Sequence, residues 1–123
     1  MVHGGAVAVP GQALEAIVRI GPDHLLYVQS ATVELVALEL DAQGNPRVLD
    51  VVSVPFAPGV RLEGPVEERV LLRVPSPWPL TMKSPDITGV ARHPVETRLR
   101  LSIDVAAHPL LEREAEVVIS APA

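Results

Sequence analysis

Thirteen prolines spread along 123 residues constrain the secondary structure of this chain more than any other feature of its sequence. Proline lacks a backbone N–H, and its ring clashes with the preceding helical turn, so an interior proline ends or kinks a helix. Few stretches between these prolines are long enough for an average α-helix of about 11 residues. Valine, the most frequent apolar residue here, favours strands because its branched Cβ fits a pleated sheet. The chain is therefore expected to consist of strands and turns.

Apolar and polar residues alternate along three stretches, as they do in strands with one buried face. The clearest alternation runs over Val95–Val105, and shorter ones run over Leu14–Ile20 and Thr32–Leu40. Antiparallel strands covered on one face produce this pattern, whereas parallel strands are usually covered on both. The residues predicted to face the core are Leu14, Ala16, Val18, Ile20, Val33, Leu35, Ala37, Val95, Thr97, Leu99, Leu101, Ile103 and Val105.

Further strands are expected at Val48–Val54, Val66–Val74 and Ala115–Ala121, with Leu110–Glu116 as a loop entering the last of them. Gly- and Pro-containing turns separate the strands. They are Gly21–Asp23, Gln43–Pro46, Ala57–Gly59 and Glu63–Pro65. Short strands at this spacing predict an all-β protein, specifically an immunoglobulin/arrestin-like β-sandwich of about seven or eight antiparallel strands. The length suits a single domain over residues 1–123.

The composition argues against several functional classes. Fifteen acidic against ten basic residues give a net charge of −5, which disfavours binding to nucleic acid or anionic membranes. The chain has no cysteine, which excludes disulfides, thiolate metal sites and a cysteine nucleophile. It also has no phosphate-binding glycine motif and no apolar run long enough to span a membrane. We expect a soluble cytoplasmic protein without a cofactor.

Three segments together resemble the arrestin-like sporulation-control family. Val9–Val18 is similar to an opening strand, a Pro-Gly turn and a second, alternating strand. Val70–Thr81 resembles the family's alternating strand that ends in Leu-Pro and is followed by Pro and Thr, and Val95–Asp104 resembles its strand with a Thr-x-Leu-x-Ile core before an acidic turn. Two positions depart from that pattern: Gly64-Pro65 replaces Pro-Gly, and only Asp104 matches the acidic turn.

The resemblance implies an arrestin-like sandwich that acts as a non-enzymatic adaptor or regulator. Family members usually carry two such sandwiches in tandem, and this chain would correspond to the first. The family has no catalytic residues to transfer.

The titratable residues form no recognisable catalytic or metal-binding pattern. The four histidines, His3, His24, His93 and His108, are far apart and lack the spacing of metal ligands. No serine lies in a nucleophile elbow. The acidic groups Glu67-Glu68 and Glu112/Glu114/Glu116 are interpreted as solvent-exposed strand faces, because a perturbed carboxyl pKa requires burial. We therefore expect no enzymatic activity and no metal site.

The segment around Trp78, the only tryptophan, is the most unusual local feature. Prolines at 75, 77 and 79 keep the backbone extended on both sides of the ring. One interpretation places the ring as a plug at the open end of the sandwich, and this is favoured. The other makes Trp78, with Pro77, Pro79 and Leu80, an exposed anchor for a protein partner, since rigid aromatic residues dominate interface energies.

An edge strand is the second candidate interface, because unpaired backbone groups can accept another strand. Several strands also carry apolar residues on the face opposite the core, which indicates burial between layers or covering by another chain. Those residues are Ile17, Val36, Leu38 and Leu40. A protein-interaction module, with homodimer formation possible, is the first functional hypothesis. A small-ligand carrier or enzyme with a site near Asp86 and His93 is the second, and a purely structural subunit the third.

Overall fold

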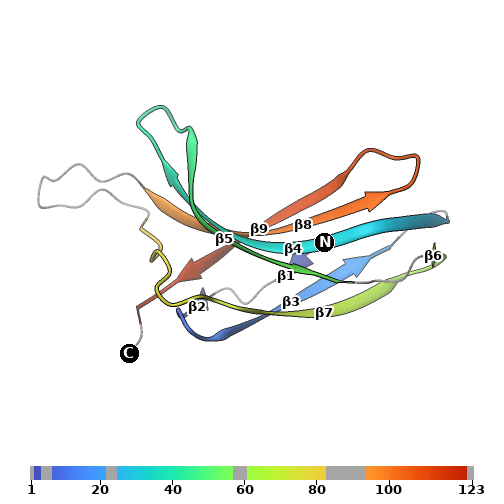
Figure 1. Ribbon diagram of the computed structural model, residues 1–123, viewed down its shortest axis with the longest axis horizontal. Helices are drawn as coiled ribbons and strands as arrows, with labels where there is room; N and C mark the ends of the chain where they lie inside the picture. The colour runs from blue at the N-terminus through green and yellow to red at the C-terminus, as the bar shows by residue number, and fades with distance from the viewer. Residues whose placement is uncertain (1, 4–6, 22–24, 57–60, 83–93, 122–123) are drawn as a thin grey trace, which may run out of the picture.

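The computed structural model describes residues 2–3, 7–21, 25–56, 61–82 and 94–121, in which nine strands form two sheets. The smaller sheet has the order β1-β3-β7 (Figure 1). Its strands are β1 (Val2–His3), β3 (Ala13–Ile20) and β7 (Val66–Arg73). Both pairings in this sheet are antiparallel, and β3 lies in the middle.

The larger sheet has the order β2-β9-β8-β4-β5, with β6 paired to the start of β4. Its strands are β2 (Val7–Ala8), β4 (Leu26–Leu40), β5 (Pro46–Pro55), β6 (Arg61–Leu62), β8 (Val95–Val105) and β9 (Leu111–Ile119). The pairing of β2 with β9 is parallel, and the others are antiparallel. The predicted all-β sandwich is confirmed. It differs from the expectation in its nine described strands and in this one parallel pair.

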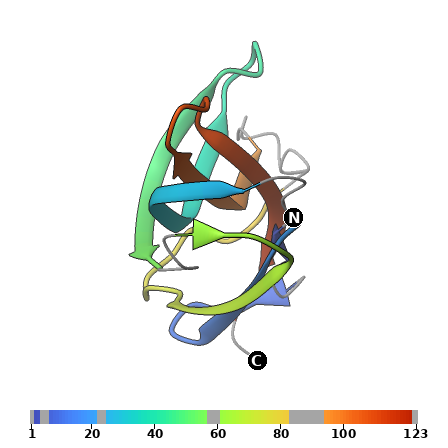
Figure 2. The ribbon, with the colours of Figure 1, turned by 90° about the vertical axis from the view of Figure 1, so that its right-hand side faces the viewer.

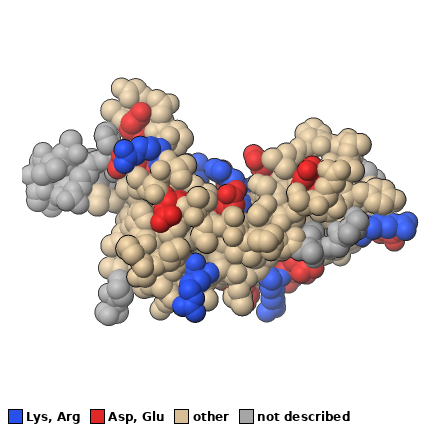
Figure 3. All heavy atoms as spheres, in the orientation of Figure 1, with Lys and Arg blue, Asp and Glu red and all other residues tan. Residues whose placement is uncertain are grey.

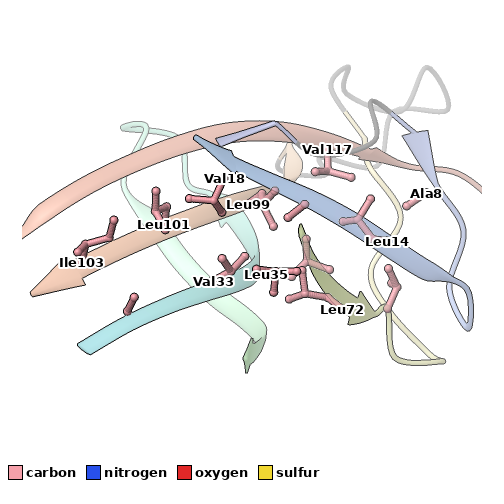
Figure 4. Packing of buried hydrophobic residues seen from close by; sticks show 14 of the residues in the cluster. Ala8, Leu14, Val18, Val33, Leu35, Leu72, Leu99, Leu101, Ile103 and Val117 are labelled. Atoms are coloured by element: carbon pink, nitrogen blue, oxygen red, sulfur yellow. The ribbon is translucent and has the colours of Figure 1, made fainter. Parts of the chain in front are cut away.

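The two sheets face each other, as the end-on view shows (Figure 2), and the core lies between them. Leu14, Val18 and Leu72 come from the small sheet, and Leu35 and Leu99 from the large one (Figure 4). The predicted inward faces of the three alternating segments are confirmed, with only Ile20 and Val95 partly buried. Alternation therefore identified the buried face of each segment correctly.

The last strand begins earlier than the sequence predicted. Leu110–Glu116 was expected to be a loop, but β9 starts at Leu111 and pairs with β8 as far as Thr97↔Val117. Glu112, Glu114 and Arg113 favour helices in isolation. Their pairing with β8 overrides that preference, because a half-exposed antiparallel strand has its backbone bonded across the hairpin.

The large sheet is curved, and this buries apolar residues on its outer face. Val36 and Leu38 are only 2% and 3% exposed although they face away from the core. The β4–β5 hairpin and the β8–β9 hairpin both bend away from the small sheet, which leaves a hollow between them (Figures 1 and 3). Register places Arg98 and Val51 beside Val36. Concave curvature and these neighbours cover the residues within a single chain.

Candidate protein-interaction site

Trp78 is a core residue. Its side chain is 4% exposed and belongs to the cluster between the sheets. Its indole N–H donates a hydrogen bond to Oγ1 of Thr97 at 3.0 Å, and Thr97 is fully buried. The neighbouring Thr81 holds the segment against β9, since Thr81 Oγ1 accepts the Ile119 N–H at 2.8 Å and the Thr81 N–H donates to the Ile119 carbonyl at 3.0 Å.

This position agrees with a plug at one end of the sandwich, and in this conformation the ring offers no surface for a partner. Of the other residues proposed to bind one, Pro77 is exposed, Leu80 is 43% exposed and Pro79 is half-buried. Partner binding by these three residues stays a prediction.

The structure distributes the acidic residues as the alternation suggested. Glu67 and Glu68 lie on opposite faces of β7, and Glu67 pairs with Arg19 at 3.1 Å. Glu114 pairs with Arg100 at 2.9 Å and with Arg98 at 3.3 Å on the outer face of the large sheet. The pKa of Arg98 is raised above its ordinary value, mainly by its hydrogen bond to Glu96, and burial opposes the shift.

Two of the four histidines belong to the described residues, and His3 lies in β1. His108 is exposed in the turn between β8 and β9, where its backbone N–H donates to the Val105 carbonyl. His24, His93 and Asp86 lie outside the described residues, so the ligand site expected near Asp86 and His93 does too. Within the described ranges no group of three or more His, Asp or Glu side chains could hold a metal ion. The same ranges contain no helix able to cross a membrane.

The four sheet edges differ sharply in how much unpaired backbone they expose. On one side the edges are β1 and β2, which have two residues each. On the other side the edges are β5, with ten residues, and β7, with eight. β1 and β2 each pair with only two residues of β3 and β9, so the rest of β3 and of β9 is also unpaired on that side among the described residues. β5 and β7 are the two long edge strands and therefore the main candidates.

Three devices protect the edge of β5. In an antiparallel sheet the backbone groups of one residue point to one side, and successive residues alternate. The Leu40 N–H bonds to the Pro94 carbonyl and the Phe56 N–H to the Ala31 carbonyl, which sets this alternation along β4. Odd-numbered residues of β4 therefore direct their N–H and C=O groups toward β5. Through the register of the two strands, the N–H and C=O groups of Val51 and Ser53 point away from β4, toward the unpaired side of β5.

Pro46 and Pro55 lie at the two ends of β5, at positions whose backbone also faces the unpaired side. As prolines, they have no N–H to donate to another strand. A register shift opposite Ala37 and Leu38 interrupts the regular alternation of inward- and outward-pointing backbone groups along β5. The Val51 N–H donates to its neighbour's carboxylate, Asp50 Oδ1, at 2.9 Å. Little of the β5 edge is left for another strand.

Among the described residues, none of these devices interrupts the edge within β7, although Pro65 and Pro75 bound the strand. The Val74 N–H donates to the Gln12 carbonyl and the Gly11 N–H to the Val74 carbonyl, so the backbone of Val74 points toward β3. Pairing of β3 with β7 is continuous from Ala13↔Arg73 to Ile20↔Val66. Alternation then directs the N–H and C=O groups of four successive odd-numbered residues toward the free side. They are Glu67, Arg69, Leu71 and Arg73.

The side chains of these four residues cover the outer face of the small sheet. Leu71 is 65% exposed between the charged Arg69 and Arg73. An edge strand is predicted by the sequence, but the sequence does not identify which one. The available signal was the run between Pro65 and Pro75, which carries neither proline nor glycine.

A pocket lies at the end of the sandwich opposite Trp78. It has a volume of about 250 Å³ and is lined by Ile20, Gly21, Leu101, Ile103 and Leu111, together with Arg19 and Arg113. Ile20, Leu101, Ile103 and Leu111 form the apolar part of its lining. Arg113 and Arg19, the latter already paired with Glu67, add two cations, so the pocket fits a small, largely apolar molecule with an anionic group.

Comparison of the fold with solved structures finds a close likeness to the crystal structure of Spo0M, the sporulation control protein of Bacillus subtilis. The TM-score is 0.71 at 9% sequence identity. The fold of this chain is an arrestin-like β-sandwich. The likeness covers 99% of this chain and 49% of Spo0M, so the chain spans about half the length of that protein.

Two variants of superoxide reductase (neelaredoxin) from Ignicoccus hospitalis resemble the chain less, each with a TM-score of 0.50 and 18% identity. Both alignments cover 98% of this chain and 78% of the enzyme. These likenesses concern the fold. No protein-family profile and no curated protein matches the sequence.

Proposed function

We propose that this chain is a non-enzymatic protein-interaction module that binds a partner by pairing with the free edge of β7. The observation that carries the proposal is the uninterrupted set of outward backbone groups from Glu67 to Arg73. Main-chain hydrogen bonds along such an edge supply affinity, and the alternating side chains supply specificity. The likeness in fold to a sporulation control protein is consistent with a regulatory role.

Edge pairing is better supported than docking through the Trp78 segment. A strand edge needs no rearrangement to accept a partner, because its donors and acceptors already point outward. Docking through Trp78 would require the ring to leave the core and to break its bond to Thr97.

A pair of proline substitutions tests the proposal. In Leu71→Pro the lost N–H faces the free side of β7, so the β3 ladder keeps its bonds while the edge loses a donor. Ser53→Pro is the matched control, because it removes the equivalent outward N–H from β5. Circular dichroism and urea unfolding establish that both variants are folded.

The readout is quantitative capture of proteins from cells that express the chain, with the tagged parent and both variants in parallel. We expect proteins captured by the parent to be lost with Leu71→Pro and retained with Ser53→Pro. Equal capture by the parent and a folded Leu71→Pro would refute the β7 edge as the docking element, and loss with Ser53→Pro alone would transfer the role to β5.

Binding of a small apolar anion is the second candidate function, and the end pocket supports it. Arg113 lies on the core-facing side of β9 opposite Leu101, and its Nη1 donates to the neighbouring Glu112 carbonyl at 2.7 Å, which leaves further N–H groups for an anion. Thermal unfolding with straight-chain fatty acids tests this function. A rise in Tm with the parent that is reduced in Arg113→Gln would support it, and no rise at millimolar ligand would count against it.

A further inference from the structure

The free edge of β7 is symmetrical about Val70. Its four outward residues, Glu67, Arg69, Leu71 and Arg73, lie at equal distances in sequence on the two sides of Val70. Pro65 and Pro75 bound the run, again at equal distances from Val70. An antiparallel partner of identical sequence can therefore match every donor and acceptor of this edge only when Val70 lies opposite its own copy.

Charge selects the same register. With Val70 opposite Val70 of a second copy, Glu67 faces Arg73 at both ends and Arg69 faces Leu71. In this register the two-fold axis that relates the copies passes through Val70. Moving the axis to Arg69 places two arginines opposite each other, and moving it to Glu68 places two glutamates opposite each other. Shifting it to Leu71 sets Arg69 against Arg73 twice. Like charges directly opposite are destabilising, and among the registers centred on residues 68 to 71 only the one centred on Val70 is free of them.

We infer that the partner of the β7 edge is a second copy of this chain, paired antiparallel with Val70 on the two-fold axis. This inference rests on the proposed function, since it uses the same edge. The pairing joins the two small sheets into one continuous sheet of six strands. It also brings the two copies of Leu71, now 65% exposed, to one diagonal of the new strand pair and the two copies of Arg69 to the other. An isologous contact of this kind closes on itself and forms a dimer.

Both end charges are available for this contact, although each already has an intrachain partner. Glu67 pairs with Arg19 at 3.1 Å with nearly half of its side chain exposed. Arg73 Nη1 donates to the Gly11 carbonyl at 3.2 Å, and an arginine has further N–H groups to donate. The second copy therefore adds ion pairs without removing existing ones.

Charge reversal tests the dimer. Light scattering and sedimentation over a range of concentrations should give twice the 13.1 kDa mass of the chain for the parent at high concentration. Glu67→Arg and Arg73→Glu each place like charges opposite each other twice, and should weaken the dimer by roughly tenfold or more. Glu63→Arg is the matched control, because it also reverses one exposed acidic residue with an intrachain arginine partner but lies outside β7.

Mixing the two single variants gives the decisive result. The Glu67→Arg chain carries arginine at both ends of the contact, and the Arg73→Glu chain carries glutamate at both ends, so opposite charges meet at each end when the two chains pair. We therefore expect an equimolar mixture of the two variants to recover the dimer that each variant alone has lost. No recovery in the mixture, with both variants folded, would overturn the register.

Cysteine cross-linking measures the register directly, because the chain contains no native cysteine. In the inferred register Arg69 faces Leu71, at a Cα separation of about 5.5 Å that suits a disulfide. A mixture of Arg69→Cys and Leu71→Cys should form a mixed disulfide dimer, and neither variant should cross-link to itself. Self-linking of Arg69→Cys or of Leu71→Cys would place the axis at that residue and overturn the inference.

The dimer and the proposed function fail in different ways. A parent chain that stays monomeric at every concentration, while Leu71→Pro still abolishes capture of another protein, overturns the second-copy inference and leaves the proposed function standing. A dimer that survives in folded Leu71→Pro overturns the inference because the contact then lies elsewhere, and the proposed function is judged separately by its own capture assay.

Discussion

The indole N–H of Trp78 and the hydroxyl of Thr97 form a hydrogen bond of 3.0 Å inside the sandwich core. Trp78 comes from the proline-rich segment after β7, and Thr97 from the start of β8. The bond satisfies the polar atom of the ring where water cannot reach it, and no buried side-chain N or O among the described residues lacks a partner. A chain with three aromatic residues has placed its largest one at the end of its core.

Removing this plug should destabilise the domain strongly. Trp78→Ala creates a cavity and should lower the free energy of unfolding by about 3–5 kcal/mol. Thr97→Val keeps the shape but leaves the indole N–H unsatisfied, which should cost about 1–3 kcal/mol. Thr32→Val, at a half-buried position of β4, is the control and should change stability by less than about 0.5 kcal/mol. Urea unfolding measures all three, and a Trp78→Ala domain of parental stability would contradict the core assignment.

Gly44 should be sensitive to substitution because of its backbone conformation. Its φ is +81°, in the region that disfavours side chains, within the turn where Asp41 Oδ1 accepts the N–H groups of Gln43 and Asn45. Gly44→Ala should cost about 1–2 kcal/mol of unfolding free energy. Gly64→Ala is the matched control, since an added Cβ there meets open space and φ lies outside the positive region, so its loss should be much smaller. Equal losses for the two variants would show that the turn conformation is not the cause.

Asp50 should act as a block on the β5 edge. Its carboxylate accepts the Val51 N–H at 2.9 Å, and Val51 is 49% exposed. Asp50→Ala frees this donor and should increase self-association, measured by light scattering in the Leu71→Pro background so that β7 does not contribute. Asp50→Asn keeps an oxygen acceptor and should associate less than Asp50→Ala. Identical masses for both variants and the background chain would show that the bond does not protect the edge.

The ion pairs of Glu114 should contribute modestly and in a salt-dependent way. Glu114→Gln weakens the contacts with Arg98 and Arg100, and the expected loss is about 0.5–1 kcal/mol of unfolding free energy at low salt. Glu112→Gln, on the same face of β9, is the control and should lose less. The raised pKa of Arg98 means that its stabilisation is complete at every pH below the ordinary arginine range and is lost only above it. Salt should therefore reduce the loss, whereas changes of pH around neutrality should not act through Arg98; a loss unaffected by molar salt would contradict this account.

Much of the fold could be predicted because strand alternation is a local property. The buried and exposed faces of Val95–Val105 follow from the sequence order of its residues, and the structure confirms them. The start of β9 was predicted wrongly because Glu112 and Glu114 have no strand preference of their own. The register with β8 makes them strand residues, by bringing Glu114 opposite Arg100.

The candidate site was less predictable than the fold. The proline pattern around Trp78 was compatible with a plug and with an exposed anchor, since both need a rigid extended segment. Outer-face apolar residues were also ambiguous: Val36 and Leu38 could have required a second chain, but curvature of the large sheet covers them within this one.

By itself, the sequence determined an all-β chain, through prolines that interrupt helices and valine-rich alternation that marks one buried face per strand. Only the tertiary structure decided that Trp78 lies inside and that β5 and β7 are the long edges. It also decided that the edge of β5 is largely blocked, while no described strand pairs with the outer side of β7. The physical reason is that a strand's own residues specify which face is apolar, whereas the direction of its unpaired N–H and C=O groups depends on which strand lies beside it and in which register.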